Sequence, residues 1–101
     1  MAQTADAIAS DFEQYIRKSG AEYYSEWYVG ITENLKDRLF GDHDVPEENH
    51  WWITRETKSI EAARKVEKFF LDKGCDGGTG GGHTDAKYVY GYKKAVLLTL
   101  R

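Results

Sequence analysis

The sequence predicts one small α+β domain, in which three helices flank a short antiparallel sheet. Its 101 residues suit a single hydrophobic core. Hydrophobic residues make up 41% of the chain and aromatic residues 14%, which is enough apolar surface to fill that core. Segments with helical periodicity alternate irregularly with short segments rich in aromatic and β-branched residues, a mixture typical of α+β folds.

The three helices are predicted from apolar residues at helical spacing that follow a capping residue. The segments are 4–19, 33–42 and a third helix that ends at Lys73. The expected N-caps are Thr4, Thr32 and either Thr57 or Ser59. Gly20 and Gly74 follow the first and third helices, where a glycine can adopt the left-handed conformation that ends a helix.

The strands are predicted from short runs of aromatic and β-branched residues. They are 26–32, 50–54 and the run KYVYGYKKAVLLTL that begins at Lys87. In the last run Tyr88, Tyr90 and Tyr92 alternate, so we expect all three on one face of the sheet. The connections are 20–25, an acidic loop at 41–49 and a glycine-rich loop at 74–86.

The distribution of charge bears on the partners that the chain can bind. A formal net charge of −3 argues against a protein that coats nucleic acid by bulk electrostatics. Residues 1–50 hold 11 acidic and 4 basic side chains, whereas residues 51–101 hold 6 acidic and 10 basic ones. A polyanion would therefore meet the C-terminal half; alternatively, the two halves simply attract each other.

Cysteine content and hydropathy bear on localisation. Cys75 is the only cysteine, which excludes a disulfide within the chain and a zinc site built from several cysteines. The N-terminus does not resemble a signal peptide, and no apolar run approaches the ~18 residues that cross a bilayer. We therefore expect a cytoplasmic protein with no membrane partner.

One charged residue breaks the pattern of the third helix. On a helical wheel the apolar side chains form one broad arc, and most of the charged ones lie opposite. Glu67 lies inside the apolar arc, between Phe70 and Ile60. An unpaired buried carboxylate is unfavourable and needs a partner. The partner is either structural, such as Arg38 in a salt bridge, or functional, such as a metal ion.

The segment YVGITENLKDRL, which begins at Tyr28, resembles the second signature of the GIY-YIG nuclease family. In that family a strand bearing Tyr-(Ile/Val)-Gly leads into a helix with an inward arginine, here Arg38. A later helix supplies a glutamate, commonly with a small residue four positions earlier, and Ala63 and Glu67 have that spacing. The resemblance covers about residues 26–71 and selects the same glutamate as the helical wheel.

The resemblance implies metal-dependent hydrolysis of phosphodiester bonds. Glu67 would hold one divalent ion, Mg²⁺ or Mn²⁺, through its oxygens. Tyr28 would orient or deprotonate the attacking water, and Arg38 would contact the scissile phosphate. His43, at the helix end where the family often has a histidine, would accept a proton or bind phosphate. The plainer interpretations are a strand aromatic, a surface ion-pair partner and a solvated histidine.

The expected substrate contacts surround these residues. They are Gly30, Lys65, Lys68, Tyr88 and Tyr90. The two lysines share the outer side of the third helix, where such charges either bind flanking phosphates or only keep the helix solvated. The partner implied by the resemblance is nucleic acid, with DNA as the first expectation and a protein as the alternative.

The chain departs from the family pattern before Tyr28. A GIY strand should precede it at hairpin distance, but the tyrosines at 23–24 are too close to leave room for two strands and a turn. We expect the C-terminal strand to take the place of the missing one, which requires residues 87–92 to lie beside residues 27–32. The late asparagine of the family has no evident counterpart after Glu67.

The glycine-rich loop carries no nucleotide-binding signature. Six of the nine residues at 74–82 are glycine, but neither a Walker A motif nor a Rossmann turn is present. Either its backbone lets a phosphate or a base approach closely, or it is a connector packed against aromatic rings. Metal binding by Cys75, Asp76, His83 and Asp85 matches no strong ligand spacing.

The leading interpretation is a GIY-YIG-like endonuclease, and two alternatives stay open. One is a catalytically silent relative that binds a protein or nucleic acid, and the other is a module that binds a small molecule. The nuclease requires Tyr28, Arg38 and Glu67 to converge on one open cleft. The silent relative requires Glu67 to be blocked by Arg38 or by packing, and the small-molecule module requires a pocket centred on residues 76–92.

Overall fold

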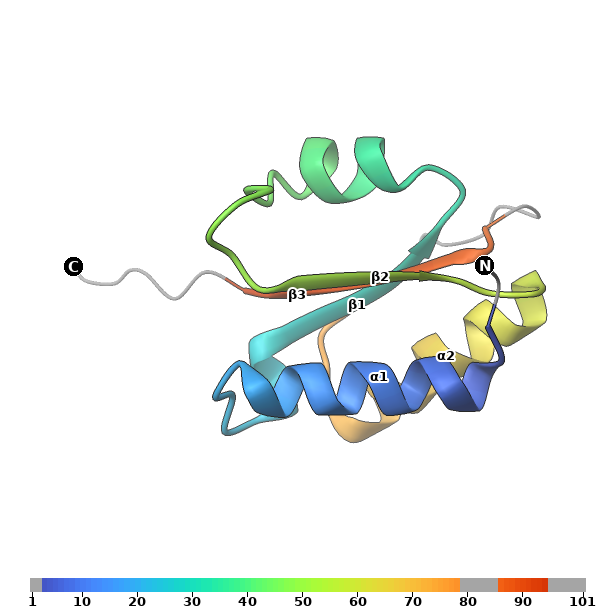
Figure 1. Ribbon diagram of the computed structural model, residues 1–101, viewed down its shortest axis with the longest axis horizontal. Coiled ribbons are helices and arrows are strands. Elements are labelled where there is room, and N and C mark those ends of the chain that lie inside the picture. Colours follow the sequence, from blue (N-terminus) through green and yellow to red (C-terminus); the bar gives the residue numbers. More distant parts are fainter. Residues whose placement is uncertain (1–2, 79–85, 95–101) are drawn as a thin grey trace.

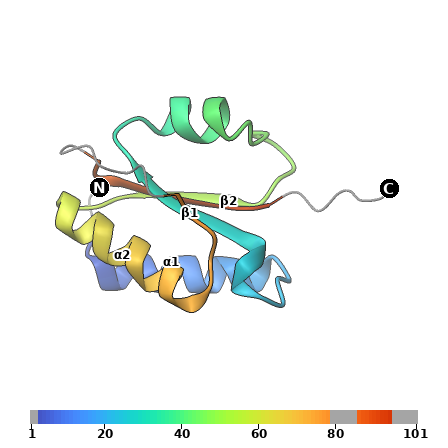
Figure 2. The ribbon, with the colours of Figure 1, turned by 180° about the vertical axis from the view of Figure 1, so that it is seen from behind.

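The computed structural model describes residues 3–78 and 86–94 of the chain. In chain order the elements are α1 (Ala5–Lys18), η1 (Tyr24–Glu26), β1 (Trp27–Thr32), η2 (Lys36–Asp42), β2 (Trp52–Glu56), α2 (Ile60–Lys73) and β3 (Tyr88–Lys93). The strands form one sheet between two helical layers: α1 and α2 cover one face, and η2 covers the other (Figures 1 and 2). The predicted α+β class, with a small antiparallel sheet flanked by helices, is confirmed.

The C-terminal strand occupies the centre of the sheet, whose order is β1-β3-β2. Both of its neighbours are antiparallel to it, and Tyr90 faces Gly30 of β1 on one side and Thr54 of β2 on the other. The expectation that residues 87–92 lie beside residues 27–32 is therefore confirmed. This pairing joins segments that lie far apart in the chain into one sheet.

The main hydrophobic core lies between the sheet and the helices α1 and α2. Phe12 and Phe70 meet there with ring centroids 5.7 Å apart, and both side chains are fully buried. Trp27 is also buried, and its indole N–H donates to Ser19 Oγ at 3.1 Å. Each such side chain contributes on the order of 1.5–3 kcal/mol when it leaves water. This layer therefore holds the fold together.

The first and third predicted helices are confirmed with their caps. Thr4 accepts a hydrogen bond from the N–H of Ala7 at 3.2 Å. Ser59, rather than Thr57, caps α2 and accepts from the N–H of Ala62 at 3.1 Å. Gly74 ends α2 at a φ of 114°, a conformation that favours glycine.

The prediction of the second helix is wrong in the residue at which the helix starts and in the type of helix. Residues 33–42 were expected to be helical after a cap at Thr32, but η2 begins at Lys36 and is a π-helix. Thr32 Oγ1 instead accepts from the N–H of Asn34 at 3.0 Å, forming a local turn, and the side chain of Asn34 accepts from the N–H of Asp37. This turn delays the helix by three residues.

The strand expected at 50–54 is shifted to Trp52–Glu56. Its position is set by the register with β3, because Glu56 faces Tyr88 and Trp52 faces Tyr92. The imidazole of His50 lies outside the ladder and bonds to the carbonyl of Lys93 at 2.8 Å. Local propensity identified the strand, and pairing fixed its ends.

Residues 79–85 of the glycine-rich loop and the chain after Lys94 lie outside the described residues. In the described part, no helix is both long and apolar enough to cross a lipid bilayer.

Candidate functional site

A small cleft opens where the outer edge of the sheet meets η2 and α2. Its empty volume is about 260 Å³, counting the solvent at its mouth. The residues that line it come from β1, η2, α2, β3 and the start of the glycine-rich loop: Tyr28, Gly30, Ile31, Arg38, Glu67, Gly78 and Tyr90. Tyr28, Arg38 and Glu67, predicted from separate parts of the sequence, therefore meet in one cleft.

Glu67 reaches the cleft from the middle of α2. It is half-buried, whereas a place inside the apolar arc predicted a buried side chain. Burial raises the pKa of its carboxyl group, and the nearby charge of Arg64 partly opposes that shift. Among the described residues no hydrogen bond or ion pair satisfies this carboxylate. Within the described chain the group thus faces the cleft without an ion-pair partner at bonding distance.

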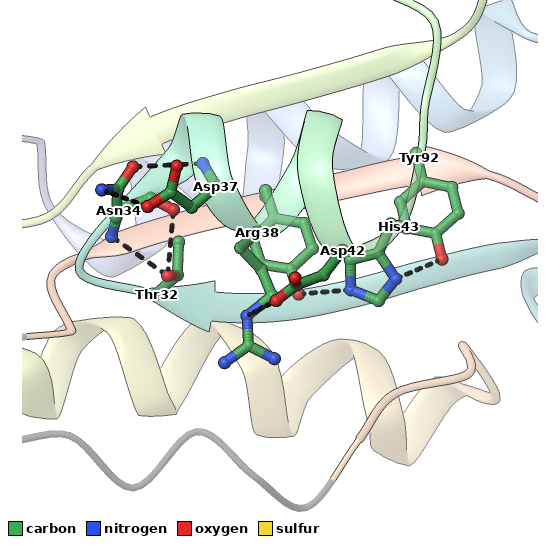
Figure 3. Close-up of polar contacts among 8 residues, drawn as sticks. Thr32, Asn34, Asp37, Arg38, Asp42, His43 and Tyr92 are labelled. Carbon is green, nitrogen blue, oxygen red and sulfur yellow. Dashed lines mark hydrogen bonds and ion pairs between the residues drawn. The ribbon is translucent and has the colours of Figure 1, made fainter.

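Arg38 reaches the cleft from η2. Its Nε lies 3.6 Å from Asp42 Oδ2, and its side chain is 32% exposed (Figure 3). In the described part of the chain it pairs with Asp42 and not with Glu67, so the interpretation of Glu67 as half of a salt bridge with Arg38 is wrong. Arg38 O accepts from the N–H of His43, five residues on, at 3.0 Å, which is the hydrogen-bond spacing of a π-helix.

Gly30 leaves room for the ring of Tyr90 in the wall of the cleft. A Cβ atom at this position would lie 2.6 Å from Tyr90 Oη and 2.7 Å from its Cζ, closer than real side chains come. The phenol ring of Tyr90 therefore crosses directly over Gly30. The glycine of the YVG segment has a packing function in addition to any contact with substrate.

Three tyrosines and a histidine form a ring cluster behind the cleft. Tyr28 stacks on Tyr92 with centroids 5.3 Å apart and on Tyr90 at 6.2 Å. The imidazole of His43 lies 4.6 Å from the ring of Tyr28. Because Tyr90 and Tyr92 come from the same strand at alternate positions, the predicted alternation of the C-terminal tyrosines to one face holds for these two.

His43 bridges two phenol groups. Its Nε2 lies 2.9 Å from Tyr90 Oη and its Nδ1 lies 3.0 Å from Tyr92 Oη (Figure 3). A neutral imidazole donates from one ring nitrogen and accepts at the other, so it holds both phenol oxygens in place. Burial, followed by the charge of Arg38, lowers the pKa of His43 and favours that neutral form.

The phenol groups of Tyr90 and Tyr92 are held in the protonated state. Burial raises the pKa of Tyr90 well above its usual value, and the neighbouring Tyr28 adds to the shift. Burial also raises the pKa of Tyr92 to about 12. Both groups therefore act as hydrogen-bond donors and acceptors at neutral pH.

His43 and Tyr92 differ from the sequence-based expectations. His43 does not line the cleft and acts only through the tyrosines it contacts. Tyr92 was not among the expected site residues, although its alternation with Tyr88 and Tyr90 was a signal that could have identified it. Tyr88 pairs with Thr32 at the far end of β3 and is absent from the cleft lining.

The two lysines lie apart from the cleft. Lys68 is exposed and pairs with Asp72 at 3.1 Å. Lys65 borders a different groove, between α1 and α2, beside Phe69. The structure thus brings Tyr28, Gly30, Arg38, Glu67 and Tyr90 together and leaves Lys65 and Lys68 on the outer surface of α2.

Gly77 and Gly78, at the described start of the glycine-rich loop, lie at the rim of the cleft. Gly78 lines it, and the preceding Gly77 packs so tightly that a Cβ atom there would lie 2.5 Å from a methyl group of Leu71 and 2.9 Å from Val29 O. The described start of the loop is thus a close-packed connector at the border of the site. His83 and Asp85, considered as metal ligands, lie outside the described residues.

Glu67 is the carboxylate best suited to a metal ion. Across residues 3–78 and 86–94 no cluster of three or more His, Cys, Asp or Glu side chains is close enough to enclose an ion. Magnesium, however, is commonly held by one or two carboxylates together with water and substrate phosphates. A half-buried glutamate that has no ion pair among the described residues and opens to a cleft fits that mode of binding.

Comparison with known proteins gives no relative for this chain: no family model matches it, and neither the curated proteins nor the solved structures contain a match.

Proposed function

We propose that the protein is a GIY-YIG-like, metal-dependent endonuclease that hydrolyses phosphodiester bonds in nucleic acid, with DNA as the first substrate to test. The observation that carries the proposal is the convergence of Tyr28, Arg38 and Glu67 on one cleft. The three residues come from different elements and from positions up to 39 apart in the chain. A phenol, a guanidinium and a carboxylate around one opening are suited to a phosphate ester.

Each side chain has a distinct task in this reaction. Arg38 binds the non-bridging oxygens of the scissile phosphate with its planar guanidinium. Tyr28, which stacks on Tyr92, orients the attacking water with its phenol oxygen. Tyr90, fixed by His43, keeps the opposite wall of the cleft in place.

Glu67 supplies the oxygen ligand for a divalent cation. Mg²⁺ or Mn²⁺ bound there would supply positive charge that stabilises the phosphate and the leaving oxygen. The raised pKa of Glu67 supports this role, because a carboxyl group that lacks a partner in the described fold gains most from a cation.

The test is cleavage of supercoiled plasmid and of single-stranded DNA and RNA by the full chain with Mg²⁺ or Mn²⁺. Glu67→Gln keeps the shape of the side chain and removes its charge, and we expect it to abolish cleavage. The matched control is Glu61→Gln, since Glu61 is an exposed glutamate on the same helix. Tyr28→Phe and Arg38→Ala should each reduce the rate by roughly 10²–10³-fold.

Metal-dependent cleavage that is lost in Glu67→Gln and kept in Glu61→Gln would support the nuclease. Absence of cleavage by folded wild-type protein with both metals would contradict it. The remaining hypothesis would then be a catalytically silent module, and fluorescence anisotropy with labelled DNA would show whether that module binds DNA.

A further inference from the structure

The two outer strands of the sheet, β1 and β2, differ in how far other segments pair with their outward backbone groups. At β1 the backbone of Asp76 covers the edge: its carbonyl accepts from the N–H of Val29 at 2.9 Å, and its N–H donates to Trp27 O at 2.8 Å. At β2 the corresponding contact within the described residues is a single bond at the end of the strand, from the N–H of Gln3 to Glu56 O at 3.0 Å. Among the described residues, the rest of the β2 edge has no further backbone hydrogen-bond partner.

The bonds between β2 and β3 identify the backbone groups that face outward. They are Lys93 N–H to Trp51 O at 3.0 Å and Thr57 N–H to Lys87 O at 2.8 Å. Alternate residues of an antiparallel strand direct their N–H and C=O groups away from the partner, so those of Trp52 and Thr54 face the open edge. Among the described residues, their one contact is from Arg55 Nη1 to Thr54 O at 2.7 Å.

A groove runs beside this edge on the face that carries α1. Its empty volume is about 450 Å³, counting the solvent at its mouth, and it is lined by Asp11, Gln14, Tyr15, Lys18, Ile53 and Arg55. Trp51 lies next to it and is 37% exposed, with its ring edge-on to Tyr15 at 5.3 Å. Open backbone groups, a groove and an exposed indole therefore lie together on one side of β2.

We infer that this edge is the docking surface for a second copy of the chain, joined by antiparallel pairing of β2 with β2 about a two-fold axis at Ile53. In that register Trp52 of each copy faces Thr54 of the other, and every open N–H meets a carbonyl. The same register places Arg55 of one copy across from Trp51 of the other, where a guanidinium and an exposed indole attract each other.

The second copy is favoured over an extended segment of another protein because the edge is complementary to itself. An interface with two-fold symmetry requires one patch to supply both halves of each contact. Here β2 offers donors and acceptors in matching positions, Arg55 lies in this strand, and Trp51 directly precedes it. Unpaired strand edges are templates for such pairing. The inference does not depend on the chemistry of the cleft.

The experiment is analytical ultracentrifugation of the full chain over a roughly thousandfold range of concentration. We expect the mass to rise from that of one chain, 11.6 kDa, to twice that value. Thr54→Pro removes an outward N–H and no bond to β3, and Trp51→Lys sets a like charge opposite Arg55. Each should raise the dissociation constant at least about tenfold.

The matched control is Tyr23→Lys, which removes an aromatic ring that is 69% exposed elsewhere on the surface and should leave the dimer intact. Circular dichroism checks that each variant is folded; if Thr54→Pro is not, Trp51→Lys decides alone. A monomer at every concentration overturns the inference and leaves the edge to a segment of another protein. A dimer that survives both edge substitutions, or that Tyr23→Lys disrupts equally, also overturns it.

Discussion

The face of the sheet under α1 and α2 is packed by apolar side chains, whereas under η2 apolar side chains such as Leu39 and Val45 share the face with phenol and imidazole rings. Phe12 and Phe70 exclude water on the first face through packing that needs no particular hydrogen bond. On the second face Tyr90, Tyr92 and His43 each need a polar partner at a defined distance. The first face can therefore provide most of the stability, while the second holds polar groups next to a cleft.

Substitutions that truncate a buried apolar side chain on the first face should have the largest effect on stability. We expect Phe70→Ala to lower the free energy of unfolding by about 3–5 kcal/mol, because it leaves a cavity beneath Phe12. Tyr92→Phe, which removes only the hydroxyl bonded to His43, should cost about 0.5–1.5 kcal/mol. Urea denaturation measures both. Equal losses would contradict the division of roles between the two faces.

Gly30→Ala tests how tightly the second face is packed. The added methyl group would meet the buried ring of Tyr90, so we expect a loss of about 1–3 kcal/mol in unfolding free energy. The matched control is Gly41→Ala, where the nearest atom to a new Cβ, Lys36 O, is 3.8 Å away. In a Tyr90→Ala background the cost of Gly30→Ala should shrink. If it does not, the clash lies elsewhere.

The smallest expected effect is the pH dependence contributed by His43. Its folded-state pKa is lowered, so the unfolded chain binds the proton more readily. The contribution of His43 to the free energy of unfolding is therefore fully present above the unfolded-state pKa of about 6.5. It is lost as the pH falls below that value and through the lower folded-state pKa. Wild type should lose more unfolding free energy than His43→Gln between about pH 8 and pH 5.5.

Measuring the difference between the two proteins isolates the histidine. Glu67 acts in the opposite sense, because its raised pKa favours the folded state on acidification, but it is present in both. Identical pH profiles for wild type and His43→Gln would mean that protonation of His43 does not disturb its bridge between the tyrosines.

Local signals predicted the parts of the fold that depend on near neighbours in the chain. The caps at Thr4 and Ser59 and the stop at Gly74 each involve residues within three or four positions, and all three are confirmed. The start of η2 was missed because two local options competed: Thr32 closes a turn with Asn34 instead of capping a helix. Propensity alone does not rank such options.

The candidate site was predictable only in part. Glu67 stood out because its charge interrupts an apolar arc, a property of one helix that a sequence displays directly. The bridge from His43 to Tyr92 joins residues 49 positions apart, and neither residue is unusual in its own segment. No periodicity or spacing rule connects them, so the partner of His43 could not be inferred.

The sequence by itself determined the helices α1 and α2, the existence of the strands and the exceptional position of Glu67, because each depends on contacts within a few residues. Tertiary structure alone decided that β3 lies at the centre of the sheet and that β2 is an edge strand. It also decided that Arg38 pairs with Asp42 rather than with Glu67. Those outcomes depend on which distant segments pair and on how the helices pack over them. Such choices are made by the total surface buried and the hydrogen bonds satisfied across the whole chain, quantities that no short segment contains.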